Sequence, residues 1–127
     1  MIEIPGIIFF RTKNLDETVQ FYTERLDMVV WLQQKGCTIL NHGNLLLGFC
    51  QKDVAETEGV ITLFFETKED VDKMYAQLED ISTTSPAEND NYKIYQFYAA
   101  DPESRILEFQ SFLHEIQPIE IDQFLRE

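Results

Sequence analysis

The sequence predicts an α+β fold in which two βαβββ modules form a curved mixed sheet around a cleft. Three observations predict it: apolar runs of strand length recur along the chain, two segments carry apolar residues at helical spacing, and the two halves of the chain can be overlaid. The 127 residues are enough for one domain with its own core, so residues 1–127 are read as a single domain.

The first module is expected at about residues 5–51. It opens with an apolar run at 6–12, which is typical of a strand covered on both faces. Asn14 is a candidate N-cap with Glu17 three residues later. One helical stripe follows, formed by Leu15, Val19, Tyr22 and Leu26. Three further strands are expected at 28–32, 37–40 and 45–50, with a hairpin turn at 41–44 between the last two.

The second module is expected at about residues 59–113 and repeats this order. A strand at 60–66 leads to Thr67 as a cap and to a helical stripe of Val71, Tyr75 and Leu78. Turn formers at 82–91 indicate a loop, with a weakly marked strand near 81–84. Strands are expected at 92–99 and 105–112, and a short terminal helix is expected at about 118–127 after Pro118.

The overlay of the two halves supports the repeat. The run 8–10 aligns with 63–65, and the two helical stripes align when one extra residue is placed in the second strand-to-helix turn. Each half is then a curved sheet with a helix on its outer face. The inner faces would enclose a cleft lined by strand side chains, where a small ligand would bind.

Charge excludes some functions. The formal net charge is −13, from 23 acidic and 10 basic residues, and such a field repels nucleic acid and anionic lipid. It would attract a cationic ligand, although excess acid more commonly serves solubility. No apolar run reaches the length of a membrane span, and the first residues do not resemble a secretory signal. A cytoplasmic location is therefore expected.

The cysteines, Cys37 and Cys50, lack the spacing of a metal site and lie in apolar, strand-like runs. In a cytoplasmic protein we expect both to be reduced, buried thiols without a function.

Two stretches carry a family resemblance. Residues 14–22, Asn-Leu-Asp-Glu-Thr-Val-Gln-Phe-Tyr, and residues 101–109, Asp-Pro-Glu-Ser-Arg-Ile-Leu-Glu-Phe, resemble the opening helix and the closing turn and strand of the vicinal oxygen chelate superfamily. This superfamily includes glyoxalases, bleomycin-resistance proteins and extradiol dioxygenases. The resemblance covers the chain except for residues 117–127. It implies a cleft, homodimerisation and, in many members, a divalent metal.

The metal ligands of the superfamily are mostly absent at the matching positions. The final-strand carboxylate matches Glu108, but the other ligands match Ile7, Thr62 and a position close to Gly48. One carboxylate cannot supply the several donors that such an ion needs, so no metal and no other cofactor is expected. The two histidines do not change this expectation, because His42 is expected in a hairpin turn and His114 on the surface after the last strand.

The closing turn also departs from the family pattern, since Ser104-Arg105 replaces the usual Gly-Asn. Ser104 is therefore expected at a positive φ without the glycine that normally adopts it.

Strand alternation then gives the candidate ligand-binding residues. If Ile7, Thr62 and Glu108 face the cleft, their neighbours two residues along do so as well, which selects Phe9, Arg11, Phe64, Glu66, Glu108 and Gln110. The alternative for the two phenylalanines is that they fill the sheet interior. The alternative for Arg11 is a structural ion pair with Glu66 or Glu108.

Three functions remain open, because a fold does not choose among them. The first is metal-independent binding of a small molecule, cationic or aromatic, in an aromatic cleft. The second is an enzyme, a lyase, isomerase or dioxygenase, with Glu108 as its catalytic general base. The third is an interaction module whose cleft has filled in. In each case a homodimer is the expected assembly.

Overall fold

The computed structural model describes residues 5–117, which form two compact units, 5–56 and 57–117. The terminal helix expected at about 118–127 lies outside the described residues. In the part of the chain that is described, no helix is long and apolar enough to cross a membrane.

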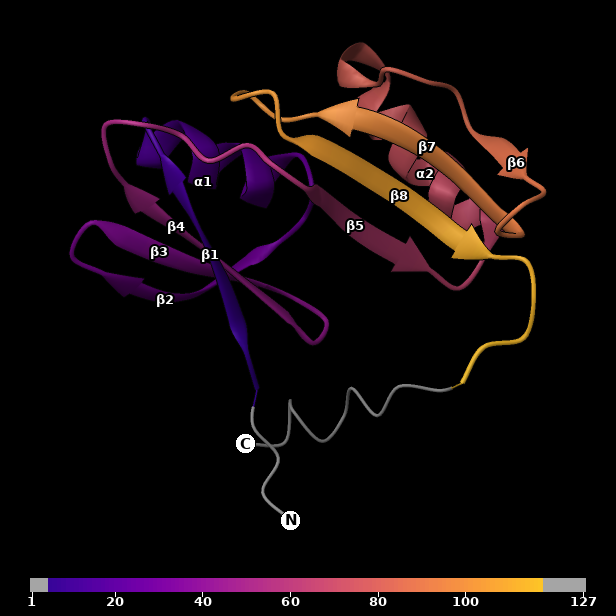
Figure 1. Cartoon of the computed structure of the whole chain (residues 1–127), viewed down its shortest axis with the longest axis horizontal. Helices are drawn as coiled ribbons and strands as arrows, with labels where there is room; N and C mark the ends of the chain where they lie inside the picture. The colour runs from indigo at the N-terminus through magenta and orange to yellow at the C-terminus, as the bar shows by residue number, and fades with distance from the viewer. Residues whose placement is uncertain (1–4, 118–127) are drawn as a thin grey trace. The chain divides into compact units, whose positions relative to one another are not determined.

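The first unit is a four-stranded mixed sheet with one helix. Its elements are β1 (Ile7–Thr12), α1 (Leu15–Glu24), β2 (Val29–Gln34), β3 (Cys37–His42) and β4 (Leu45–Gln51). The strand order is β1-β4-β3-β2, with β1 parallel to β4 and the other neighbours antiparallel (Figure 1).

The second unit repeats this plan. Its elements are β5 (Val60–Phe65), α2 (Lys68–Leu78), the short 3-10 helix η1 (Glu79–Ile81), β6 (Ala87–Asn89), β7 (Ile94–Ala100) and β8 (Ile106–Phe112). The order is β5-β8-β7-β6, with only β5 and β8 parallel (Figure 1). The expected α+β fold of two βαβββ modules is confirmed.

The sixth strand lies later than expected. The segment 81–84 contributes only an isolated bridge between Ser82 and Ala99, whereas β6 forms at Ala87–Asn89, inside the stretch interpreted as a loop. Alanine, glutamate and asparagine are poor strand formers, so local propensity does not mark this strand. Antiparallel pairing with β7 determines its position.

Both helices begin at the expected caps. The Asn14 side chain accepts a hydrogen bond of 3.1 Å from the Glu17 backbone N–H, and Thr67 accepts one of 3.1 Å from Asp70. The backbone N–H of Asn14 donates to Thr12 Oγ1 at 3.2 Å. Each cap satisfies a backbone donor that the first turn leaves without a partner.

Each helix covers one face of its own sheet with aromatic contacts. Tyr22 of α1 lies 4.9 Å from Phe49 between ring centroids, and Tyr75 of α2 lies 5.2 Å from Phe97. Phe97 in turn stacks on Phe109. Side chains alternate along a strand, so the neighbours of Phe97 and Phe109 point to the face of the second sheet turned away from α2. We call this the open face. These neighbours are Gln96, Tyr98, Glu108 and Gln110.

The first strand is not covered on both faces as expected. Ile7, Ile8 and Phe9 are 36%, 56% and 47% exposed. The reason is topological: β1 is an edge strand that pairs only with β4. An apolar run alone does not distinguish a central strand from an apolar edge.

The cysteines form a disulfide, so the expectation of reduced thiols is wrong. The hairpin register places Cys37 of β3 directly opposite Cys50 of β4, with their Cα atoms 4.1 Å apart. That separation is slightly shorter than the usual disulfide range of about 4.4–6.8 Å. Both strands and the turn between them were expected, but the register that pairs the two cysteines was not considered.

The closing turn is held by a buried ion pair. Ser104 has a φ of 71°, which confirms the expected positive value. A guanidinium nitrogen of Arg105 donates to Asp101 at 3.0 Å and to Glu103 at 2.9 Å, and the side chains of Arg105 and Asp101 are 3% and 0% exposed. The Asp101 carboxylate also accepts the backbone N–H groups of residues 103 and 105. These bonds fix the turn that precedes β8, the strand that carries Glu108.

Candidate functional site

The open face of the second sheet carries a connected polar network around Glu108. Thr62 on β5 is paired with Glu108 on β8 and donates a hydrogen bond of 2.7 Å to its Oε1. Gln96 on β7 donates its side-chain N–H to the other carboxylate oxygen, Oε2. The carboxylate is therefore held from both neighbouring strands.

Gln96 extends this network in two further directions. Its Nε2 donates to the Tyr98 hydroxyl oxygen at 3.2 Å, and its Oε1 accepts from the Asn89 side chain at 3.0 Å. The Asn89 Oδ1 accepts the backbone N–H groups of Asn91 and Tyr92. This side-chain-to-backbone turn fixes the loop that carries Tyr92 beside the open face.

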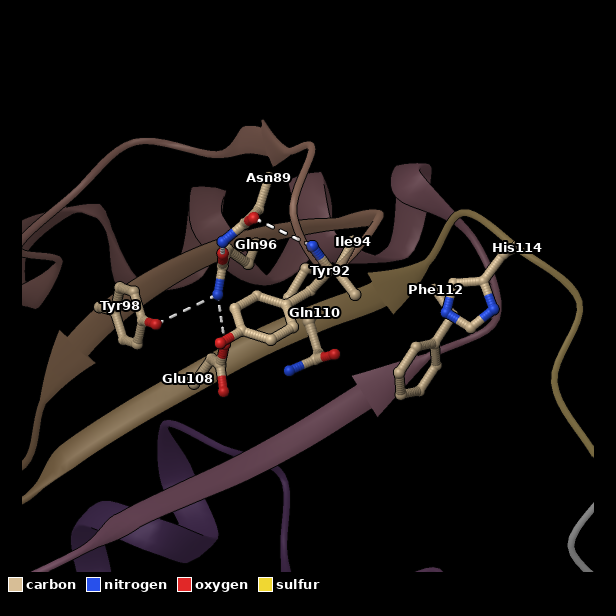
Figure 2. Close-up of a pocket in the computed structure, with 9 residues that line it drawn as sticks. All are labelled: Asn89, Tyr92, Ile94, Gln96, Tyr98, Glu108, Gln110, Phe112 and His114. Atoms are coloured by element: carbon tan, nitrogen blue, oxygen red, sulfur yellow. Dashed lines mark hydrogen bonds between the residues drawn. The ribbon is translucent and has the colours of Figure 1, made fainter.

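A pocket of about 420 Å³ lies over this network (Figure 2). Such a volume fits a small ligand. Its wall combines rings with polar groups: the aromatic members are Tyr92, Tyr98, Phe112 and His114, and the polar members are Asn89, Gln96, Glu108 and Gln110.

Glu108 has hydrogen-bond donors but no counter-ion among the described residues. No lysine, arginine or histidine within 5–117 forms an ion pair with it. Burial, and then the negative charge of Glu108, raise the pKa of the Tyr98 hydroxyl above its ordinary value. Tyr98 is thus a protonated donor at neutral pH, beside a carboxylate without a cationic partner.

Gln110 is the second polar group without a complement. It is 8% exposed and lines the pocket, and its side-chain amide makes no hydrogen bond within residues 5–117. Figure 2 shows this amide in the pocket, two residues along β8 from Glu108, with no bond to the residues drawn. On the paired strands its neighbours are Phe64 and Gln96.

The second unit brings together three of the residues selected from the sequence. Glu108 and Gln110 line the pocket, and the Phe64 ring lies 5.4 Å from the pocket residue Phe112. Glu66 was expected on the same strand face, but β5 ends at Phe65 and Glu66 is exposed in the following bend.

The other two selected residues belong to the first unit. The Phe9 ring covers Gly48, where it occupies the space that a Cβ would take. The backbone N–H of Arg11 donates to Glu56 at 2.8 Å, and the Arg11 Nε lies 4.0 Å from the same carboxylate oxygen. Arg11 thus pairs with Glu56 rather than with the expected Glu66 or Glu108.

Four residues of the network were missed in the sequence: Asn89, Tyr92, Gln96 and Tyr98. Gln96 and Tyr98 alternate with Phe97 and Ala99 in a segment that was expected to be a strand. Alternation alone would have put them on one face. Their proximity to Glu108 required the β7–β8 register, in which Tyr98 lies opposite Glu108.

The histidines also differ from expectation. His42 is the last residue of β3 rather than a solvated turn residue, and burial lowers its pKa. His114 is exposed as expected, but its ring lines the pocket and lies 5.6 Å from Phe112.

The donor set does not suit the divalent metal that the family resemblance implies. Both Glu108 oxygens already accept hydrogen bonds, Thr62 uses its proton to donate to Glu108, and the space above Gly48 is taken by Phe9. Within residues 5–117, no three His, Cys, Asp or Glu side chains are grouped so that they could hold an ion. The residues present do not fit the metal, and we derive no chemistry through it.

Comparison with solved structures identifies the fold. An integron cassette protein from the mobile metagenome of the Halifax Harbour sewage outfall matches with a TM-score of 0.75 and 21% identity, covering 87% of this chain and 100% of that one. A glyoxalase/bleomycin resistance protein/dioxygenase from Nocardioides matches with a TM-score of 0.71 and 16% identity, covering 94% of this chain and 90% of that one. Lactoylglutathione lyase from Agrobacterium tumefaciens matches with a TM-score of 0.70 and 18% identity, covering 83% of this chain and 90% of that one.

These matches show that the chain has the fold of the glyoxalase/bleomycin resistance/dioxygenase proteins, the vicinal oxygen chelate fold. No family model matches the sequence, and no curated protein matches it. The specificity of the chain therefore has to be argued from its own pocket.

Proposed function

We propose that this protein binds a small cationic or aromatic molecule, without a metal, in the pocket of its second unit. The observation that carries the proposal is the Glu108 carboxylate, which uncharged donors hold at the pocket and which no cationic side chain of residues 5–117 neutralises. A partly buried charge is costly without a partner, and a cationic ligand would supply one.

The rest of the pocket supports the same class of ligand. Aromatic faces attract cations, and Tyr92, Tyr98 and Phe112 line the same pocket as the carboxylate. The net charge of −13 adds a long-range attraction for positive ligands. The volume of about 420 Å³ argues against an interaction module with a filled site.

A second candidate is an isomerase or lyase in which Glu108 is the general base. The position of Tyr98 favours it, because a protonated hydroxyl beside the carboxylate supplies the second group that acid–base chemistry needs. Turnover of a bound compound, lost in Tyr98→Phe while binding persists, would distinguish the enzyme from the binding protein.

Thermal shift and calorimetry with a panel of cationic, neutral and anionic aromatic compounds test the proposal. A bound ligand must stabilise the folded state. We expect cationic compounds to bind, Glu108→Gln to abolish the binding, and the exposed control Glu79→Gln to leave it unchanged. Equal binding by the wild type and Glu108→Gln, or no binding by any cation, would reject the proposal.

We also propose a homodimer in the cytoplasm. The apolar side chains exposed on the edge strands β1 and β2 support dimerisation, notably Ile8 and Trp31 at 56% and 52%. Light scattering at micromolar concentration would refute it by giving a monomer mass. Cell fractionation tests the location. Because stable disulfides are uncommon in the cytosol, the Cys37–Cys50 disulfide argues against this location, and recovery of the protein outside the cytoplasmic fraction would refute it.

A further inference from the structure

We infer that the ligand has two recognition groups: a cationic N–H group that binds Glu108 and a neutral amide-like group that binds Gln110. This inference rests on the proposed function, and it specifies the class of compound that the same pocket takes. The ligand would be an amino amide, or a ring compound that presents an equivalent neutral donor and acceptor.

Gln110 carries this inference. Its residue is 8% exposed, its amide lines the pocket, and it has no hydrogen-bond partner within residues 5–117. Gln96 is 9% exposed on the same face, but both ends of its amide form hydrogen bonds within the protein, to Asn89 on one side and to Tyr98 and Glu108 on the other. The Gln110 amide is open to the pocket, since among the described residues only Ser111 Oγ is a fully buried polar side-chain atom without a partner. The amides of residues as buried as Gln110 are normally paired, so a ligand that enters the pocket would supply its partner.

An amide side chain selects a particular complement. It offers an N–H donor and a C=O acceptor side by side, and a second primary amide satisfies both at once. A carboxylate would satisfy only the donor and would be repelled by Glu108. An apolar group would satisfy neither and would leave the amide buried without a partner.

The spacing of the two groups sets the distance between the ligand's two ends. Glu108 and Gln110 are two residues apart on one face of β8, which corresponds to about 7 Å along the strand. Across the sheet, Glu108 lies between Thr62 and Tyr98, and Gln110 lies between Phe64 and Gln96. The cationic end therefore lies at a position flanked by two polar residues, and the neutral end lies at a position flanked by Phe64 and Gln96.

Four probes built on one benzene ring test the inference by calorimetry. They are 4-(aminomethyl)benzamide with both groups, benzylamine with the cation alone, benzamide with the amide alone, and 4-(aminomethyl)benzoate with a carboxylate in place of the amide. We expect 4-(aminomethyl)benzamide to bind about three- to tenfold more tightly than benzylamine, which is the effect of one satisfied amide. Benzamide and the benzoate should bind more weakly than benzylamine.

Gln110→Met keeps the length of the side chain and removes the amide. We expect it to bind 4-(aminomethyl)benzamide and benzylamine equally, while the exposed control Gln33→Leu keeps the wild-type preference. Circular dichroism confirms folding first, and Gln110→Leu replaces Gln110→Met if that variant does not fold.

The outcomes distinguish amide recognition by Gln110 from the cation binding that we propose for Glu108. If both amines bind equally to the wild type, or if the preference survives in Gln110→Met, the amide recognition is wrong although cation binding stands. If neither amine binds and Glu108→Gln changes nothing with any cation of the wider panel, the proposed function itself fails.

Discussion

Thr62 and Glu108 lie opposite each other on the paired strands β5 and β8, and the Thr62 hydroxyl donates a 2.7 Å hydrogen bond to the Glu108 carboxylate. These two positions match metal-ligand positions of the family that the sequence resembles. A neutral hydroxyl here supplies one hydrogen bond to the carboxylate, which leaves the negative charge of Glu108 uncompensated. The cationic ligand that we propose would compensate this charge.

Removing this hydroxyl tests its role in positioning Glu108. Thr62→Val keeps the side-chain shape and should lower the free energy of unfolding by about 1.5–3 kcal/mol, because one hydrogen bond to a charged, partly buried acceptor is lost. Urea denaturation measures the change. Thr57→Val, an exposed position outside the strands, is the control. Weaker binding of cationic probes by Thr62→Val than by Thr57→Val is expected, and equal affinities would show that Thr62 does not position Glu108.

The ionisation of Tyr98 should depend on Glu108. Burial raises its pKa most, and the negative charge of Glu108 adds to the shift, so Glu108→Gln should lower the pKa toward the ordinary value of 10. Ultraviolet titration measures the transition, which Tyr98→Phe identifies by removing it. Tyr95, whose pKa a hydrogen bond to Asp72 raises to about 12, is the internal control and should not move.

The same shift has a consequence for stability, whose sign follows from proton binding. Since the pKa of Tyr98 is higher in the folded than in the unfolded state, the folded protein binds more protons above about pH 10. The stability that the neutral hydroxyl contributes is present below pH 10 and is lost as the pH rises through the folded pKa. Tyr98→Phe should show a weaker alkaline loss than the wild type, and an unchanged profile would contradict the assignment.

The closing turn should be sensitive to its buried ion pair. Arg105→Met leaves the fully buried Asp101 without its cation, and breaking such a pair costs about 3–5 kcal/mol. Lys68→Met removes an exposed pair with Glu88 of similar length, 2.9 Å, and should cost less than about 1 kcal/mol. Equal losses in the two variants, measured by chemical denaturation, would mean that Asp101 does not depend on Arg105.

The sequence predicted the fold well because the fold is encoded in local signals. The caps at Asn14 and Thr67, both helices and most strands follow from spacing and are present as expected, although Leu26 of the first stripe lies beyond the end of α1. β6 was misplaced because its short segment of poor strand formers has no local signal and forms by pairing with β7. The exposure of β1 depends on its place at the sheet edge, which its own residues do not specify.

The site was only half visible from the sequence. Glu108 and Gln110 follow from alternation along the strand that contains the motif at 101–109, and Phe64 follows from alternation with Thr62. Tyr98 and Gln96 reach Glu108 only through the register of β7 on β8, and Tyr92 reaches the pocket through the Asn89 turn. Registers and loop conformations depend on tertiary packing, so neither can be deduced from periodicity.

The disulfide predicts a difference between oxidised and reduced protein. Cys37 and Cys50 are 13 residues apart in sequence, and closing a loop of this length contributes about 3 kcal/mol to stability in the loop-entropy description. Reduction should lower the urea midpoint accordingly, and the Cys37→Ser/Cys50→Ser variant should match the reduced wild type. If an alkylating reagent labels both cysteines in protein purified without a reductant, the disulfide does not form.

We expect elemental analysis of the purified protein to find no near-stoichiometric zinc, nickel, manganese or iron. Catalytic ions need several donors in a fixed geometry with positions left open for substrate. At the matching positions, Ile7 has no lone pair, Gly48 has no side chain and lies beneath the Phe9 ring, and Thr62 offers only a neutral hydroxyl.

Glu108 remains as one carboxylate, and an ion held by it alone would keep most of its water and exchange freely. To bind an ion more firmly, the carboxylate would have to give up its bonds from Thr62 and Gln96. Titration of added Mn²⁺ should therefore give weak, exchangeable binding for the wild type, and Thr62→Val, in which one carboxylate oxygen has lost its donor, should bind Mn²⁺ no less tightly. Near-stoichiometric metal that disappears in Glu108→Ala, but persists in the exposed control Glu79→Ala, would overturn this argument and favour a metal-dependent enzyme.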